Sequence, residues 1–351
     1  MLARTPFIVI WDYKNHTQLE LDLAHSTRLI QLIEDPSRFD GTSEMDAAFL
    51  AARLLLTDIS PQREWGWDDL SKIFHIGTKN LPIEKLPNNI HEWAALYLDH
   101  CEQVLDTPAP IDRFTKSSNE GLISLPTPNS VKKTSSLITT LLERKTSRSF
   151  SDQAVTLNDL SSLLYLSLGY LKEREAEADD TIPEALRARR SSPSGGGLNA
   201  CEGYVYAARI LGLEPGIYYY HPDLHALRQV HSLPNEPLGL LLTGQHFINQ
   251  LPMGLFITSR FDKLWWKYEH SRAYRMAYVE AGHISQTFQL VATALGLATW
   301  LTGALSDERV ELLLGLEDSA EQPLFFVGGG YGDGQVHCKE LRTLIESRER
   351  G

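Results

Sequence analysis

The sequence predicts a mixed fold of helices and strands, of the α+β or α/β class. Segments with apolar residues at helical spacing alternate with short strand-like segments along most of the chain. The 351 residues are 42% hydrophobic and 22% charged, an ordinary composition that argues against extensive disorder. A chain of this length can form one large domain or two of ordinary size.

The first part of the chain contains a predicted hairpin followed by helices. Residues 7–22 form two expected strands joined by a turn at residues 14–16, because leucines alternate with polar residues in the second strand. Helical periodicity then predicts helices at about 23–34, 44–59 and 89–105. Residues 107–130 contain four prolines among polar residues and are expected to be a linker. We therefore expect an N-terminal domain of residues 1–130 and a larger domain of residues 131–351.

The second part alternates predicted helices and strands. A long helix is expected from about residue 271 to 295, because small and apolar residues recur on one face and Gly296 follows where a glycine commonly ends a helix. The other predicted elements are helices at 135–145 and 157–168 and strands at 203–208, 216–220 and 323–327.

Charge and cysteine content exclude several classes of protein. Lys and Arg total 33 against 45 Asp and Glu, and the resulting net charge of −12 argues against a nucleic-acid surface. The apolar stretch at residues 290–305 is shorter than a membrane span, so no membrane association is expected. Three separated cysteines form neither a disulfide framework nor a zinc motif, so we expect a reducing cytoplasm and no metal site.

Two clusters have side chains or backbone groups suited to a phosphorylated ligand. Arg144, Thr146 and Arg148 offer two guanidinium groups and a hydroxyl within five residues, which suits a phosphate, although a solvated helix end explains them equally well. The segment of residues 193–197 has three consecutive glycines, whose N–H groups a ligand can approach closely. It matches neither a Walker loop nor a GxGxxG motif, and a flexible loop is an equal alternative.

A third candidate is the pair Lys267 and Tyr268, just before the long helix. A lysine beside a tyrosine is an acid–base candidate, because the ammonium charge favours the phenolate. Taken alone, however, such a tyrosine is more often a packed aromatic with a wet hydroxyl group.

The order of these motifs resembles that of the flavin-dependent nitroreductase-like superfamily. Within it, the closest match is the SagB-type dehydrogenases, the branch that includes azoline oxidases. The resemblance covers about residues 135–335 and is carried by residues 190–197, 213–220, 267–268, 272–275, 280–286 and 294–297. It implies an α+β nitroreductase-like fold with a mostly antiparallel central sheet, flanking helices and a long central helix. A small winged-helix-like domain is expected to precede it.

The resemblance also implies FMN as the cofactor and assigns residues to it. The phosphate motif falls on Arg144, Thr146 and Arg148, and Gln286 lies in the helix that lines the flavin. The loop that meets the isoalloxazine ring falls on Pro193, Ser194, Gly195 and Gly196. His283 and Cys201, which lie close to these motifs in the sequence, are expected to have structural roles only.

By the same resemblance, the expected reaction is oxidation of a thiazoline or oxazoline ring in a peptide to the azole. Lys267 and Tyr268 fall on the Lys-Tyr pair that azoline oxidases use for proton abstraction. The ring Cα–H is acidic because imine and carbonyl groups adjoin it, and hydride leaves the neighbouring carbon for the flavin. We expect Tyr268 to be the base, as a phenolate whose pKa is lowered by Lys267.

The expected partners are a peptide substrate, with or without a leader peptide, and a cyclodehydratase, and we expect a homodimer. Residues 1–130 either bind a leader peptide by strand addition or support the dimer. Two other interpretations of the function remain open. One is a general NAD(P)H-dependent reductase of nitro compounds or quinones, which would not need Lys267 and Tyr268. The other is a non-enzymatic scaffold of a peptide-modifying complex that has lost its flavin.

Overall fold

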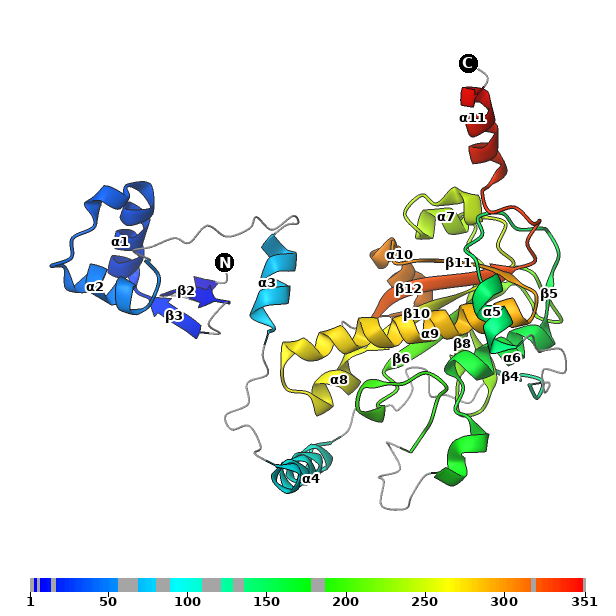
Figure 1. Cartoon of the computed structure of the whole chain (residues 1–351), viewed down its shortest axis with the longest axis horizontal. Helices are drawn as coiled ribbons and strands as arrows, with labels where there is room; N and C mark the ends of the chain where they lie inside the picture. Colours follow the sequence, from blue (N-terminus) through cyan, green and yellow to red (C-terminus); the bar gives the residue numbers. More distant parts are fainter. Residues whose placement is uncertain are drawn as a thin grey trace. The chain divides into compact units, whose positions relative to one another are not determined.

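The computed structural model describes residues 3–4, 7–13, 17–55, 69–79, 89–108, 121–128, 136–177, 187–316 and 320–349 (Figure 1). Packing divides the chain into two units, Met1–Leu86 and Pro87–Gly351. This division lies before the expected linker rather than near residue 130. The end of the expected linker is part of the second unit, because β4 (Leu122–Ser124) pairs with β9 (Ala226–Ser232). The expected turn at residues 14–16 lies outside the described residues.

The first unit contains a small antiparallel sheet and short helices. Its strands are β1 (Ala3–Arg4), β2 (Phe7–Asp12) and β3 (Thr17–Leu21), in that order. Its helices are α1 (Leu23–Glu34), η1 (Pro36–Arg38), α2 (Glu44–Ala51) and α3 (Asp69–Gly77). The expected strand pair is therefore present. Helix α2 ends earlier than the predicted 44–59, because Arg53 adopts a φ of +57° that a helix does not allow.

An ion pair between a half-buried arginine and a buried aspartate joins helices α1 and α2 of the first unit. Arg28 donates from Nε and Nη2 to the two carboxylate oxygens of Asp46, at 2.8 and 2.6 Å. This side-chain hydrogen bonding lowers the pKa of Asp46 to about 2. The apolar core beside it is small and consists of Leu21, Leu32 and Phe49.

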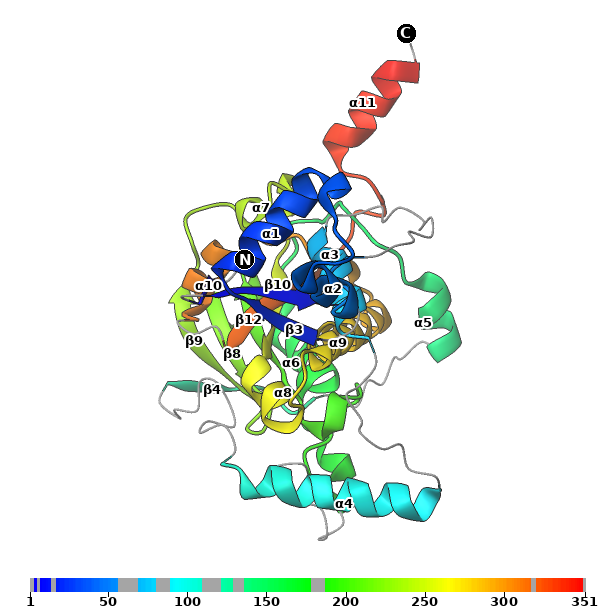
Figure 2. The same ribbon diagram turned by 90° about the vertical axis from the view of Figure 1, so that its left-hand side faces the viewer.

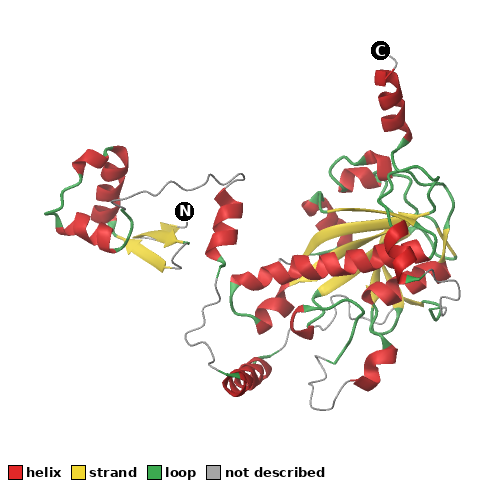
Figure 3. Cartoon of the chain, in the orientation of Figure 1, coloured by secondary structure: helices red, strands yellow, loops and turns green. Residues whose placement is uncertain are grey.

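The second unit is built on a seven-stranded sheet in which every neighbouring pair is antiparallel (Figure 3). The strand order is β11 (Ala298–Thr302), β12 (Glu321–Gly330), β10 (Met253–Arg260), β6 (Cys201–Ala207), β8 (Gly216–His221), β9 and β4. The predicted strands correspond to β6, β8 and β12. The interior strand β10 was not predicted, because all eight of its residues are buried and neither face shows the period-two alternation of apolar and polar residues.

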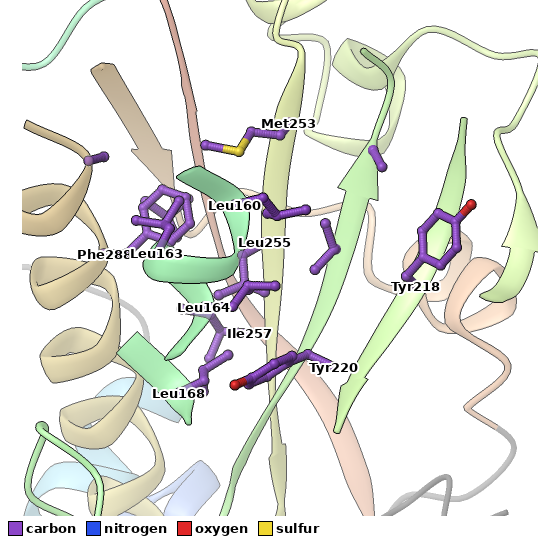
Figure 4. Packing of buried hydrophobic residues seen from close by; sticks show 14 of the residues in the cluster. Leu160, Leu163, Leu164, Leu168, Tyr218, Tyr220, Met253, Leu255, Ile257 and Phe288 are labelled. Atoms are coloured by element: carbon purple, nitrogen blue, oxygen red, sulfur yellow. The ribbon is translucent and has the colours of Figure 1, made fainter. Parts of the chain in front are cut away.

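Helices cover both faces of this sheet. On one face, α6 (Leu157–Leu168) and α9 (Tyr274–Ala294) pack against strand residues such as Leu255 and Ile257 (Figure 4). On the other face, α7 (Leu238–Leu241) and α10 (Asp307–Leu314) contribute to a second core that contains Phe256. Successive residues of β10 thus enter opposite cores, as the pleat of a strand requires. The antiparallel sheet flanked by helices confirms the predicted nitroreductase-like fold.

Helix α9 lies along the sheet and carries most of the contacts described below (Figures 1 and 2). It has 21 residues, about 31 Å at 1.5 Å per residue. The short helix η6 (Ser271–Ala273) precedes it, and Gly296, with a φ of +79°, follows it as predicted. No helix in the described part of the chain has both the length and the apolar content to cross a membrane.

The second unit contains further helical segments. They are α4 (Ile90–Asp106), α5 (Leu137–Glu143), η2 (Lys172–Glu177), η4 (Gly195–Gly197), η5 (His246–Ile248), α8 (Phe261–Lys267) and α11 (Lys339–Glu349). A short parallel pair, β5 (Val155–Thr156) and β7 (Ile210–Leu211), forms a separate sheet. Helix α8 directly follows β10 and ends at Lys267. The position of Lys267 and Tyr268 therefore depends on the end of this strand.

Candidate functional site

The glycine-rich loop is held against α9 by its serine. Ser194 Oγ donates to Glu280 Oε2 at 2.7 Å and accepts from the backbone N–H of Asn199 at 2.8 Å. Gly196 adopts a φ of +62°, a left-handed conformation that costs a glycine little. The loop is therefore closed on itself and fixed to the helix.

A buried ion pair anchors the base of this loop. Glu280 Oε1 accepts from the backbone N–H of Cys201 at 2.9 Å and lies 3.7 Å from Arg190 Nη1. Arg190 also donates to the carbonyl oxygens of Leu168 and Cys201, at 2.7 and 2.8 Å. Both charged side chains are only 2% exposed, so each depends on the other and on these hydrogen bonds. Sequence reasoning gave these two residues no role, because a glutamate within a helix usually faces water.

His283 and Cys201 occupy the structural positions that were expected. His283 Nδ1 lies 3.2 Å from the carbonyl oxygen of Pro193 and so forms one more link between loop and helix. Cys201 is fully buried, and burial raises the pKa of its thiol well above the ordinary value. A buried thiol of this kind is unreactive.

Lys267 and Tyr268 meet the loop at Gly196. Lys267 Nζ donates to the carbonyl oxygen of Gly196 at 3.1 Å. A β-carbon added at residue 196 would lie 2.6 Å from the Tyr268 hydroxyl and 2.9 Å from Lys267 Nζ. Only a glycine leaves room for both polar groups here. The structure thus brings the candidate acid–base pair and the candidate flavin loop into contact.

Burial changes the protonation of this pair. It lowers the pKa of the Lys267 ammonium and raises the pKa of the Tyr268 hydroxyl. The Tyr268 shift is opposite to the one expected from the sequence, because desolvation of the phenolate is the largest contribution. Desolvation therefore shifts both groups in the direction of their uncharged forms.

The arginine cluster lies where α5 ends. Thr146 forms a parallel bridge with Thr299, and the backbone N–H groups of Ser147 and Arg148 donate to Thr299 and Val336 at 2.8 Å. These backbone contacts attach the segment to β11 and to the residues after β12. The side chains of Arg144, Thr146 and Arg148 are each half-buried.

Glutamine side chains connect the arginine cluster to α9. Arg144 Nη1 donates to Gln289 Oε1 at 3.4 Å, and Gln289 Nε2 donates to Gln286 Oε1 at 3.4 Å. Gln286, which the resemblance placed beside the flavin, is exposed, whereas Gln289, which sequence reasoning missed, is buried. Glu280 and Gln289 are nine residues apart, about 14 Å along the helix. One helix thus contacts both groups of predicted cofactor residues, through Glu280 and Gln289.

A cavity of about 690 Å³ lies between α4 and the loop and reaches Lys267. One wall is formed by loop residues, among them Pro193, Ser194 and Gly196. The other wall is the side of α4 that carries Tyr97 and Cys101, which are joined by a hydrogen bond. Sequence reasoning had assigned this helix to the N-terminal domain and missed its contribution. The sequence of α4 does contain a signal for this role, because apolar residues recur at helical spacing on one side of the helix.

The donors present fit a flavin mononucleotide. Guanidinium groups and a hydroxyl at residues 144–148 match the oxygens of a phosphate. At the other end, the left-handed Gly196 keeps its backbone free of a side chain. Among the described residues, no group of three or more His, Cys, Asp or Glu side chains could hold a metal ion.

Several named proteins are similar to this chain in sequence. A protein of Methanocaldococcus jannaschii named as a nitroreductase is 29% identical over 191 residues, which cover 54% of this chain and 88% of the relative. The trifolitoxin operon protein TfxC of Rhizobium leguminosarum is 24% identical and covers 76% of this chain and 72% of the relative. The microcin B17-processing protein McbC of Escherichia coli is 29% identical over 40% of this chain and 54% of the relative.

Solved structures are also similar. A nitroreductase from Ralstonia eutropha superimposes with a TM-score of 0.49 at 22% identity, over 65% of this chain and 94% of that one. A chain of the Escherichia coli microcin synthetase McbBCD complex has a TM-score of 0.45 at 22% identity, over 75% of this chain and 91% of that one. The sequence model of the nitroreductase family matches residues 141–331, more than half of the chain. The chain therefore belongs to the nitroreductase family of oxidoreductases.

Proposed function

We propose that this protein is an FMN-dependent oxidoreductase that dehydrogenates thiazoline or oxazoline rings of a peptide to azoles. The observation that carries the proposal is the contact of Lys267 and Tyr268 with Gly196 of the glycine-rich loop. A general flavin reductase has no need of a proton acceptor at this position. Similarity to proteins of trifolitoxin and microcin B17 processing supports the choice of a peptide substrate.

The chain would hold FMN at both ends of the site. Arg144, Thr146 and Arg148 would bind the phosphate through charge-assisted hydrogen bonds. Pro193, Ser194, Gly195 and Gly196 would border the ring system, and Gln286 would line it from α9. Bound FMN would supply a two-electron acceptor, and the protein would supply position and a proton acceptor.

We assign the role of proton acceptor to Lys267. Burial lowers the pKa of its ammonium, so the amine loses its proton at a lower pH than an exposed lysine does, and Nζ can then take the ring Cα proton. Burial raises the pKa of Tyr268, so its hydroxyl stays protonated and can donate a hydrogen bond that orients the substrate. The hydrogen bond from Lys267 to Gly196 keeps Nζ at the edge of the loop.

The first unit would recognise the rest of the peptide. Its sheet order places β3 at one edge, where an extended leader peptide could add as a further strand. In the same proposal, a cyclodehydratase forms the rings before this protein oxidises them, and the active form is a homodimer. Deletion of residues 1–86 should slow turnover of a leader-bearing substrate and leave that of a leaderless one unchanged.

The test uses a synthetic peptide with one internal thiazoline and the FMN-loaded full chain. We expect the mass of the peptide to fall by two hydrogens while the flavin absorbance bleaches under anaerobic conditions. Lys267→Met should lower kcat/KM by about 10²–10⁴-fold, as removal of a general base does. Tyr268→Phe should have a smaller effect, and Lys339→Met, on the exposed side of α11, should have none.

Three outcomes would contradict the proposal. Rapid flavin reduction by NADPH without conversion of the peptide would indicate a general reductase. A colourless protein that binds no FMN would indicate a scaffold. Equal rates of peptide oxidation for wild-type protein and Lys267→Met would show that Lys267 is not the proton acceptor.

A further inference from the structure

Helix α4 lies outside the residues matched by the family model but inside the second unit. One side of it lines the 690 Å³ cavity with Glu102 and with the five residues Tyr97, Leu98, Cys101, Val104 and Leu105, which we call the α4 face. Residues three, four and seven positions apart share one side of a helix, so the α4 face is continuous. The nitroreductase domain therefore has an added wall beside its candidate site.

The α4 face is apolar and accessible. Tyr97 is 47% exposed, Leu98 60% and Leu105 44%, although all three line a concave surface. Apolar side chains left open in a cavity of this size are typical of a ligand site.

A hydrogen bond fixes the C-terminal end of α4 beside the candidate acid–base pair. Trp266 Nε1, one residue before Lys267, donates to the carbonyl oxygen of Thr107 at 3.3 Å. Thr107 is the C-cap of α4 and bonds in turn to Val104. The hydrogen bond from Trp266 therefore links the C-terminal end of α4 to the residue before Lys267.

We propose that the α4 face binds the apolar side chain of the peptide residue that precedes the oxidised ring, and so determines which sequences this protein accepts. This inference rests on the function proposed above. The cavity that contains the α4 face also contains Lys267, so a ring positioned at Lys267 has its neighbouring residue in the same cavity. The loop side of the cavity is formed by the residues that would border FMN, and the opposite side is formed by the apolar residues of the α4 face together with Glu102.

The test compares two thiazoline peptides that differ only in the residue before the ring, leucine or glycine. For FMN-loaded full-length protein, calorimetry gives the Kd of each peptide and mass spectrometry gives kcat/KM. We expect a preference of about tenfold or more for leucine in both quantities, as hydrophobic pockets give for small apolar differences. Leu98→Ala should lower this preference several-fold, and Leu98→Trp should reverse it by filling the cavity. Leu96→Ala, the same change on a part of α4 that does not line the cavity, should keep it.

Each outcome decides the inference separately from the proposed function. A leucine preference in Kd that Leu98→Ala removes, without oxidation of either peptide, would uphold the α4 face and refute the azoline oxidase. Oxidation of both peptides with a preference that Leu98→Ala and Leu98→Trp leave unchanged would refute the α4 face alone. Equal Kd values together with a lower molar mass of Leu98→Ala in light scattering would assign the α4 face to contact with a second copy and overturn the inference. Absence of binding by either peptide would also overturn it.

Discussion

The two ends of the candidate site along α9 are built in different ways. One end, which we call the loop end, lies where Glu280 meets the glycine-rich loop. Buried charges and hydrogen bonds fix the loop there, and Lys267 contacts Gly196 directly. The other end, which we call the arginine end, lies where Gln289 meets residues 144–148. The backbone of these residues is held by hydrogen bonds, while the side chains of Arg144 and Arg148 remain half-buried. The groups proposed for chemistry are thus positioned by the fold itself. The groups proposed for phosphate binding keep access to solvent and to a charged ligand.

This difference follows from the cost of burying charge. A buried carboxylate is stable only when every oxygen is used, and Glu280 meets that condition with two hydrogen bonds and an ion pair. A guanidinium that must bind phosphate cannot be buried in advance without a partner. We therefore expect mutations at the loop end to affect folding and mutations at the arginine end to affect cofactor affinity.

Glu280→Ala should have the largest effect on stability. It leaves Arg190 buried without its carboxylate and removes the acceptor of Ser194 and of the Cys201 N–H group. We expect the free energy of unfolding in urea to fall by about 3–5 kcal/mol. The control is Glu346→Ala on α11, where the side chain is exposed and the loss should stay below about 0.5 kcal/mol. Equal losses for the two variants would show that the loop end is not fixed by this pair.

Arg144→Ala should weaken FMN binding and leave the fold intact. Loss of hydrogen bonds between a guanidinium and a phosphate costs about 1.5–3 kcal/mol, which corresponds to roughly 10- to 100-fold in Kd. Titration of FMN fluorescence measures this change, and thermal unfolding of the FMN-free protein should be unaffected. Lys145→Ala removes the same charge from the next residue, whose side chain is exposed, and should raise Kd less than threefold. A larger effect for Lys145 than for Arg144 would mean that the phosphate site is misassigned.

Gly196→Ala separates backbone strain from crowding at the loop end. A side chain at a φ of +62° costs about 1–2 kcal/mol, and its β-carbon would also displace Lys267 and Tyr268. Gly244→Ala is the matched control, because its φ is +80° and no atom lies within 4 Å of the added carbon. We expect both variants to lose stability, Gly196→Ala more than Gly244→Ala because of this crowding, and only Gly196→Ala should lose most of its activity with the thiazoline peptide. Full activity of Gly196→Ala would contradict a role for this contact.

The sequence predicted most of the helices and strands around the site but not the contacts between them. Helices α6 and α9 and strands β6, β8 and β12 have clear periodicity or turn residues, and they were predicted to within a few residues. Strand β10 was missed because its residues are buried on both faces. The loop and the Lys267 and Tyr268 pair were located by resemblance, but their contact at Gly196 depends on how α8 leaves β10.

Other features of the site depended on tertiary packing and had no local signal. Glu280 and Arg190 are far apart in sequence, and nothing near either residue indicates an ion pair. The α4 face was missed because a proline-containing segment separates α4 from the rest of the second unit in sequence. Burial also reversed the expected shift of the Tyr268 pKa, since the neighbouring charge was visible in the sequence and the desolvation was not.

A final experiment uses pH to distinguish the two ends. At the loop end, burial lowers the pKa of Lys267, so protons leave the amine at a lower pH than in an exposed lysine. The neutral amine is the proposed acceptor, and kcat/KM for the thiazoline peptide should therefore rise with pH and reach a plateau below the ordinary lysine value of about 10.4. Lys267→Met should abolish this rise. At the arginine end, guanidinium groups keep their charge, and the FMN Kd should change less than about twofold between pH 7 and 9. If FMN affinity and kcat/KM instead change together over this range, one titrating group affects both ends, and the division of the site proposed here is wrong.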